Sequence, residues 1–231
     1  MTGTTGSALP VSGVEVTGKG RGGAPAFAWL WIAGALLASM ALALLATVPA
    51  LPTTADAVAL WVDDASLQLT WAGEVLFFAT IAWGTGAAGA FGARGTGSPL
   101  RRMTALVALS VALIAFVIVL LALGRLVYPV VDIELEAETI VLLESVVVGA
   151  VHLALLALGV VAFTLPVPVR STRARRAVLA VGFALGVVFV AGSYPWLLPM
   201  WLNLVVAGAV GCWGVFVGVA VLARERGQLR A

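Results

Sequence analysis

The chain has 231 residues, of which 62% are hydrophobic and 10% are charged, with a mean hydropathy of +1.12 and a formal net charge of +2. A soluble domain carries roughly a quarter charged residues, so this composition excludes a water-soluble protein and leaves no room for a separate soluble domain. The apolar runs, each near the roughly 20 residues that a helix needs to cross a bilayer, predict an all-α integral membrane protein, a six-helix transmembrane bundle.

The chain begins with a polar segment, residues 1–26, which is rich in Gly, Thr and Ser and is expected to be a disordered cytoplasmic tail. The first apolar run, residues 27–48, is longer than the roughly 7–15 apolar residues of a secretory signal peptide, which favours an uncleaved span over cleavage after Ala50. Trp29 and Trp31, near the start of this run, are expected at the membrane interface.

An acidic stretch, residues 51–70, separates the first run from the second. Within it, residues 56–69 are expected to form a short amphipathic helix that lies on the membrane surface, with Leu60 and Trp61 dipping into lipid. The remaining spans are expected at 71–93, 103–127, 139–165, 177–192 and 200–223, and residues 224–231 form a short basic cytoplasmic tail.

The charges are distributed unevenly between the loops. Basic residues gather in both terminal tails and in the second and fourth loops, whereas the first and third loops hold Asp56, Asp63, Asp64, Asp132, Glu134, Glu136 and Glu138. Because Lys and Arg near span ends are retained in the cytoplasm, both termini are expected on the cytoplasmic side. The strong preference for Arg over Lys suggests a prokaryote, whose plasma membrane would hold this multi-pass protein.

Glu74, Arg125 and Glu144 each lie about one turn inside the outer end of a predicted span. Charges in the hydrocarbon cost about 2.5–3.5 kcal/mol each, so such groups normally face protein or water. One interpretation is a shared cluster in which Arg125 pairs with one glutamate and leaves the other able to exchange protons near neutral pH. The alternatives are a purely structural ion pair, or interfacial acids with Arg125 extended toward the headgroups.

The only histidine, His152, lies eight residues beyond Glu144, which places it about 12 Å deeper along a helix. Glu144, Ser145, Gly149, His152 and Gly159 fall within an arc of about 140°, and this stripe is expected to face the interior of the bundle. His152 is then a candidate proton relay or substrate contact. The alternative is a neutral imidazole hydrogen-bonded to a neighbouring helix.

Other residues are weaker candidates. The pairs Gly182/Gly186 and Gly214/Gly218 favour close helix packing within the bundle, with formation of a homodimer as the second interpretation. The secondary polar candidates are Tyr128, Ser145 and Asn203. Three large aromatic residues are expected to pack in the bundle or to face lipid: Trp83, Phe189 and Trp213.

The inventory of residues excludes several functions. A single histidine excludes a bis-histidine haem within one chain, and the only lysine, Lys19, lies in the tail. The acidic third loop lacks the turn glycine and the ligand order of a calcium loop, which favours a solvated loop over a cation site. With one Cys and one His an ordinary zinc site would need several carboxylates, and no phosphate loop, nucleophile elbow or HExxH motif is present. We therefore expect no catalytic residue, cofactor or metal. The basic loops are short and suit anionic lipid headgroups better than nucleic acid.

Two functions remain. The first is a small permease or proton-coupled transporter with a polar cavity near the outer face, built from Glu74, Arg125, Glu144 and His152. The second is a non-transporting accessory or structural subunit that lies in the bilayer and binds a protein partner. An intramembrane enzyme that acts on a lipid has no supporting motif, and no motif is specific to a family.

Overall fold

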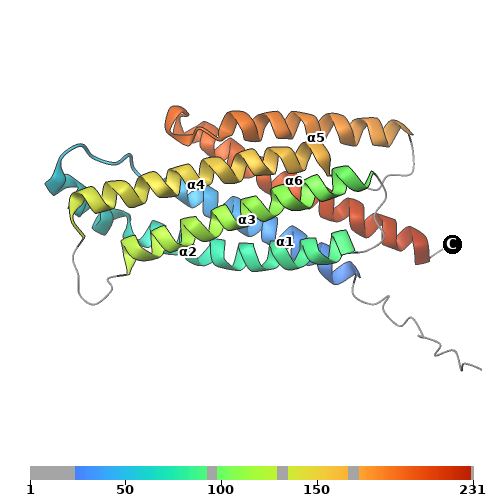
Figure 1. Ribbon diagram of the computed structural model, residues 1–231, viewed down its shortest axis with the longest axis horizontal. Coiled ribbons are helices and arrows are strands. Elements are labelled where there is room, and N and C mark those ends of the chain that lie inside the picture. Colours follow the sequence, from blue (N-terminus) through green and yellow to red (C-terminus); the bar gives the residue numbers. More distant parts are fainter. Residues whose placement is uncertain (1–23, 93–97, 129–134, 166–171, 230–231) are drawn as a thin grey trace, which may run out of the picture.

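The computed structural model describes residues 24–92, 98–128, 135–165 and 172–229, and these form a bundle of long α-helices without a β-strand among them (Figure 1). In chain order the helices are α1 (Ala24–Ala46), α2 (Ala55–Gly92), α3 (Pro99–Val127), α4 (Ala137–Thr164), α5 (Thr172–Gly192), the short 3₁₀ helix η1 (Pro195–Leu197) and α6 (Met200–Leu229). Most of the polar tail predicted at residues 1–26 lies outside the described residues.

Each predicted span falls on one helix, and the described part of the chain is all-helical, with apolar helices compatible with a multi-pass membrane protein. Five helices are long and apolar enough to cross a membrane by length and composition, and the apolar part of α5, Arg176–Gly192, is shorter. The ends of the helices differ from the predicted spans by a few residues, except at the start of α2 and the end of α6.

The start of α2 differs from the prediction. Residues 56–69, expected as a short helix on the membrane surface, belong to the first turns of one continuous helix of 38 residues. Val58, Trp61, Ala65 and Leu69 recur at helical spacing and are all buried, so this segment packs on the bundle rather than on lipid. Trp61 donates its Nε1–H to the carbonyl oxygen of Pro49 at 2.9 Å, whereas Leu60 is exposed.

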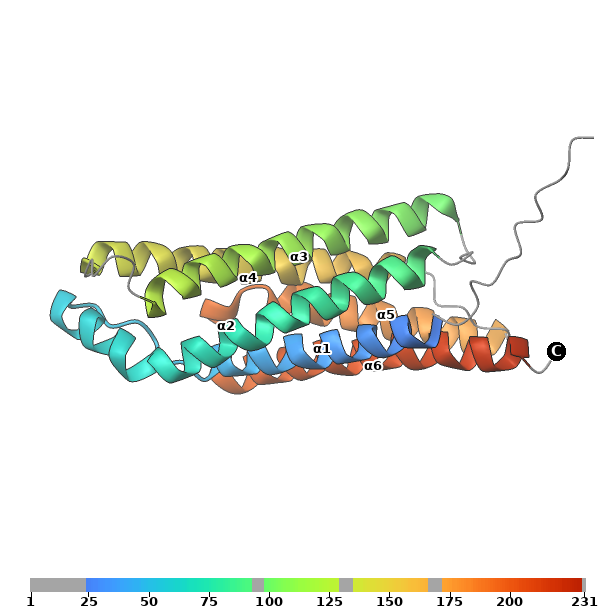
Figure 2. The same ribbon diagram turned by 90° about the horizontal axis from the view of Figure 1, so that it is seen from below.

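As a consequence, α2 is much longer than a membrane is thick. At 1.5 Å per residue it spans about 57 Å, against about 30 Å of hydrocarbon. Figure 2 shows its first turns extending past the end of α1. We infer that these turns stand outside the apolar layer.

The helix α1 packs extensively against both α2 and α6. A Cβ atom at Gly34 would lie 2.5 Å from the backbone nitrogen of Trp83, and one at Gly86 would lie 2.5 Å from that of Trp31. These two glycines therefore allow the backbones of α1 and α2 to approach each other, as small residues do in membrane helix pairs. On the other side of α1, Ser39 donates its hydroxyl to the carbonyl of Ala207 in α6 at 2.7 Å.

Large aromatic side chains from five helices fill the centre of the bundle. This aromatic core consists of Trp31 (α1), Trp83 (α2), Phe116 (α3), Phe189 (α5) and Trp213 (α6), all of them buried. The ring centroids of the three tryptophans lie 5.8–6.2 Å from one another. The interfacial position predicted for Trp31 is therefore wrong: this side chain points into the bundle, while Trp29 is exposed. Composition alone does not show which face of an apolar helix meets its neighbours.

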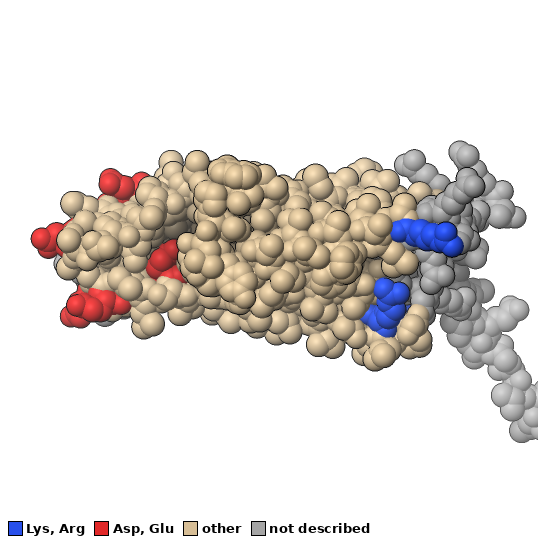
Figure 3. Space-filling model, turned by 90° about the horizontal axis from the view of Figure 1, so that it is seen from above, with Lys and Arg blue, Asp and Glu red and all other residues tan. Residues whose placement is uncertain are grey.

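Charged side chains are separated along the length of the bundle. Acidic residues lie toward the end formed by the starts of α2 and α4, and the described basic residues other than Arg125 lie at the opposite end (Figure 3). We call the first the acidic end and the second the basic end. At the basic end Arg101 donates its Nη2–H to the carbonyl oxygen of Phe163 at 3.0 Å, which satisfies a carbonyl in the last turn of α4.

Candidate functional site

Near the acidic end, the antiparallel arrangement of α2 and α3 brings Glu74 and Tyr128 together. Tyr128, the residue after the last turn of α3, donates its hydroxyl to Oε1 of Glu74 at 3.2 Å. Partial desolvation of the phenol, and then the hydrogen bond to and the charge of Glu74, raise the pKa of Tyr128 above its usual value of 10.0, against an opposite effect of Thr70. The phenol is therefore protonated at neutral pH and serves as a hydrogen-bond donor.

This pair lies at a groove of about 290 Å³ between the two helices, which we call the α2–α3 groove. Its lining residues come only from α2 and from α3 with its final Tyr128: Leu69, Thr70, Gly73, Glu74, Phe77, Leu120, Leu123, Gly124, Val127 and Tyr128. The groove exists partly because two of these positions carry no side chain. A Cβ at Gly124 would meet no atom within 4 Å, and one at Gly73 would only touch Leu123 at 4.0 Å.

Arg125, expected to pair with Glu74 or Glu144, makes no ion pair with either carboxylate among the described residues. Its side chain is half-buried, and its Nη1 is buried without a hydrogen-bond partner in the same part of the chain. The structure therefore places Arg125 at the acidic end as predicted, but it does not link it to the candidate acids.

Glu144 and the stripe around it are arranged differently from the prediction. Glu144 is half-buried on α4, but Ser145 and Gly149 are exposed, and a Cβ at Gly149 would meet open space. The hydroxyl of Ser145 donates to the carbonyl of Val141 in its own helix. The face of α4 that packs into the bundle is instead the apolar one, centred on Ile140, Val147, Val151, Ala154 and Leu158. Of the predicted stripe, Gly159 alone is buried, against Gly186 and Val190 of α5, and His152 is half-buried.

His152 is hydrogen-bonded to the residue that follows the last turn of α5. Its Nδ1 lies 2.6 Å from the carbonyl oxygen of Ser193, so this nitrogen carries the proton in the neutral ring and Nε2 is left as the acceptor. The imidazole also packs against Tyr194 and Trp196, with ring centroids 4.9 and 5.7 Å away. This arrangement matches the alternative of a histidine hydrogen-bonded to a neighbouring helix.

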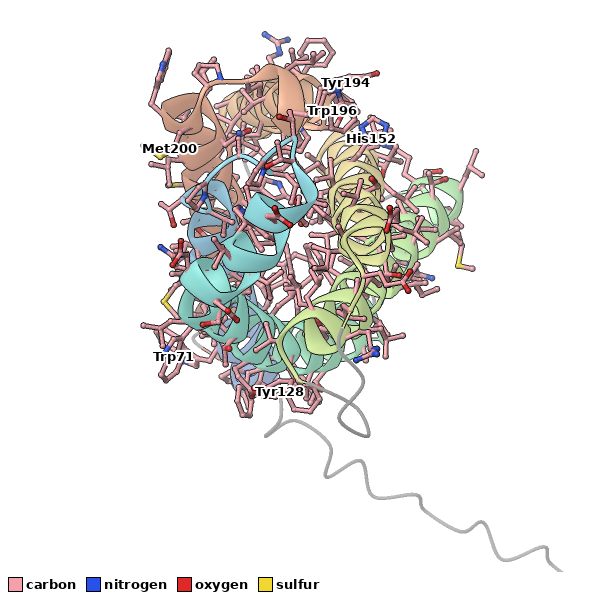
Figure 4. All side chains as sticks on the ribbon, turned by 90° about the vertical axis from the view of Figure 1, so that its left-hand side faces the viewer. Trp71, Tyr128, His152, Tyr194, Trp196 and Met200 are labelled. Carbon is pink, nitrogen blue, oxygen red and sulfur yellow. The ribbon has the colours of Figure 1, made fainter. Side chains whose placement is uncertain are left out.

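The four ionisable candidates do not form one cluster. Figure 4, which looks onto the acidic end, shows His152 with Tyr194 and Trp196 on one side of the bundle, whereas Tyr128 lies at another edge. Only Glu74 and Tyr128 are joined by a hydrogen bond. The structure therefore separates the candidates: Glu74 lies in the α2–α3 groove and His152 contacts Ser193. Arg125 and Glu144 have no ion pair among the described residues.

The remaining candidates take part in packing. The amide nitrogen of Asn203 donates to the carbonyls of Pro195 and Leu198, at 3.0 and 3.4 Å, and so holds the turn between α5 and α6. Each of the four motif glycines faces another helix of the same chain: Gly182 and Gly186 face Ala162 and Phe163 of α4, and Gly214 and Gly218 face Ala35 and Ile32 of α1. These contacts correspond to the first interpretation, packing within the bundle.

The groove itself was not foreseen from the sequence, although Glu74 and Tyr128 were both candidates. The sequence does contain a signal for a groove, because each residue has a glycine nearby on one of two consecutive spans. Gly73 is next to Glu74, and Gly124 is one turn before Tyr128. Among the described residues no group of three or more His, Cys, Asp or Glu side chains could hold a metal ion.

Comparison of the chain with models of protein families, with curated proteins and with solved structures gives no match. The function is therefore argued from the geometry of the sites, and fold class alone does not indicate it.

Proposed function

We propose that the chain is a non-transporting component of a membrane, a structural or accessory subunit that binds its partner through the outside of the bundle. The observation that carries this proposal is the aromatic core. A polar solute that moved along the axis would have to displace Trp31, Trp83 and Trp213, whose side chains are in mutual contact. Closely packed interiors resist such displacement, and a dry aromatic centre offers an ion no ligands.

The positions of the ionisable groups also support this proposal. Coupled transporters place their binding groups together near the middle of the membrane, where half-helices or facing side chains hold the substrate. Here the Glu74–Tyr128 pair lines a groove on the surface of the bundle, and the Nδ1 of His152 is hydrogen-bonded to the carbonyl oxygen of Ser193. A surface that binds a partner needs no path through the centre.

The most peripheral helix, α5, supplies a surface for such a partner. It lies along one edge of the bundle in Figure 1, against α4 and, less extensively, α6. Leu179, Val181, Phe183 and Val187 are exposed along it. Helices associate in membranes through van der Waals packing, so an apolar helix with an open face suits a partner helix as well as lipid.

A flux assay tests the proposal. Liposomes that contain the full chain and a trapped pH-sensitive dye are given a pH gradient and a membrane potential, with protein-free liposomes as the control. We expect the wild type, Glu144→Gln and His152→Ala all to dissipate the gradient at the rate of protein-free liposomes. A faster rate in the wild type that either substitution reduces would contradict the proposal.

Photo-crosslinking tests the partner. A photoreactive amino acid at Phe183 on α5 is compared with one at Ile114 on α3, which is similarly exposed. We expect a discrete crosslinked protein from position 183 in the native membrane and none from position 114. Equal crosslinking from both positions, or none from 183, would count against a partner on α5.

The alternative is a small permease or proton-coupled transporter, and one observation favours it. Glu144 is a half-buried carboxylate with no ion pair among the described residues, as a proton-exchanging group would be. This alternative predicts proton flux in the same liposomes that is lost in Glu144→Gln.

A further inference from the structure

We propose that the α2–α3 groove binds a single membrane lipid whose headgroup carries a primary ammonium, with the ammonium on Glu74 and an acyl chain along Gly73, Leu120 and Gly124. The site combines one uncompensated carboxylate, aromatic rings and an apolar channel. This inference concerns a lipid site on the outside of the bundle and holds whether or not the chain transports a solute.

The carboxylate of Glu74 is the recognition group. A carboxylate offers about four lone-pair sites, and Tyr128 uses one of them, on Oε1, at 3.2 Å. The Nη1 of Arg125, on the neighbouring helix, makes no hydrogen bond to this carboxylate among the described residues. At the boundary of an apolar layer, where the dielectric constant is lower than in water, such a group attracts a cation more strongly than it would in solution.

The rings beside the carboxylate fit the same charge. Phe77 and Tyr128 line the groove and are each about half-exposed, 48% and 50%, so their faces remain accessible from lipid. A cation near an aromatic face gains about 0.5–2 kcal/mol, depending on how far it is desolvated. Two half-exposed rings do not form an aromatic cage, and the free oxygen of Glu74 favours a headgroup with N–H donors. A primary ammonium has them and a trimethylammonium does not.

The remainder of the groove is suited to a hydrocarbon chain. Its floor and walls are Leu69, Leu120, Leu123 and Val127, with the two glycines between them. A volume of about 290 Å³ lies just below the roughly 300–1,000 Å³ of small-molecule sites. That volume holds part of one chain, whereas a helix with its side chains is about 10–12 Å wide. A lipid is therefore the occupant that fits, and a helix of another protein is not.

Native mass spectrometry of the purified full chain, titrated with one lipid at a time, measures the binding. The probes are dioleoyl phosphatidylethanolamine, dioleoyl phosphatidylcholine and dioleoyl phosphatidylglycerol, which share their chains and differ in headgroup. We expect one phosphatidylethanolamine per wild-type chain, with an apparent affinity at least tenfold above that for the other two lipids. Equal binding of phosphatidylcholine would overturn recognition of a primary ammonium, and equal binding of all three lipids would overturn the role of Glu74.

Two pairs of variants localise the site. Glu74→Gln should remove the tenfold preference, whereas Glu138→Gln, which changes the same charge at the same end outside the groove, should keep it. Gly124→Leu adds a side chain at a lining position of the groove where nothing lies within 4 Å of the Cβ position, and it should abolish the single-lipid complex.

Gly208→Leu is the control for the second pair, since Gly208 is also exposed to open space but lies on α6. It should bind phosphatidylethanolamine as the wild type does. A thermal unfolding curve followed by tryptophan fluorescence shows that each variant is folded. Retained binding in Gly124→Leu, or an equal loss in Gly208→Leu, would mean that the lipid binds elsewhere.

Discussion

At the scale of single residues, the aromatic core has the largest effect on stability that the structure implies. Trp83 contacts Trp31, Phe116 and Trp213, and its side chain is fully buried. In a membrane the cost of removing it comes mainly from lost van der Waals contacts and from the cavity, because lipid is as apolar as the core.

We therefore expect Trp83→Ala to lower the free energy of unfolding by about 3 kcal/mol, the lower end of the range for Trp→Ala in cores. The control is Phe78→Ala, which removes an exposed ring from the same helix and should change stability by less than about 0.5 kcal/mol. Equilibrium unfolding in mixed micelles measures both. Equal losses of unfolding free energy in the two variants would show that the buried ring of Trp83 stabilises the protein no more than an exposed ring does.

The hydrogen bond from His152 to the carbonyl of Ser193 predicts a smaller effect. His152→Phe keeps the ring contacts with Tyr194 and Trp196 but removes the donor. Hydrogen bonds between membrane helices contribute about 0.6 kcal/mol on average and up to about 1.7 kcal/mol, so a loss in that range is expected from the same unfolding measurement. A variant as stable as the wild type would mean that the bond has no net effect.

Tyr128 predicts a pH dependence. Its pKa is raised in the folded state, so the protonated phenol is favoured by folding; this contribution is fully present below pH 10 and is lost as the pH rises through the higher folded value. The stability difference between the wild type and Tyr128→Phe should therefore stay constant from pH 6 to pH 9 and shrink only above about pH 10. Unfolding measured across that range tests this, and a difference that falls between pH 7 and pH 9 would contradict it.

At the scale of the helices, close approach between α1 and α2 depends on glycines that face a backbone. A methyl group at Gly34 would meet the backbone of Trp83, which has no flexible end to move aside. We expect Gly34→Ala to destabilise the protein by about 1–3 kcal/mol, as overpacking does. Gly208→Ala, where the added methyl meets open space, should instead stabilise α6 by about 0.5–1 kcal/mol through its higher helix propensity. Opposite signs in one unfolding assay confirm the account, and two equal shifts contradict it.

The helices could be predicted from the sequence because their apolar runs are long and are separated by prolines, glycines and charges. The error at α2 has a physical cause. Asp56, Asp63 and Asp64 lower the hydropathy of residues 55–70, but they lie on the exposed face of a helix whose other face is apolar and buried. The fall in hydropathy therefore does not mark the start of this helix.

The candidate site was less predictable, because it depends on which face each helix presents. Charge and depth selected Glu74, Arg125, Glu144 and His152, but they could not show that only Glu74 would meet Tyr128. The helical positions of Ser145 and Gly149 suggested an interior stripe, but both residues are exposed, and apolar residues of small and large size occupy the buried face of α4. When nearly every residue of a helix is apolar, the pattern that distinguishes a buried face from an exposed one is weak.

At the scale of the whole molecule, the central claim is that the bundle crosses the membrane with its acidic and basic ends on opposite sides. From the separation of charge in Figure 3 and the preference of basic residues for the cytoplasm we predict that the acidic end lies outside. The α2–α3 groove would then open to the outer leaflet.

Labelling of single cysteines in intact cells with a membrane-impermeant maleimide tests this claim most directly. In a Cys212→Ser background, Asp63→Cys and Glu138→Cys report the acidic end, and Arg102→Cys and Arg176→Cys report the basic end. The account predicts that the first two are labelled in intact cells and the last two only after the membrane is permeabilised. Labelling of both ends from the same side would contradict it.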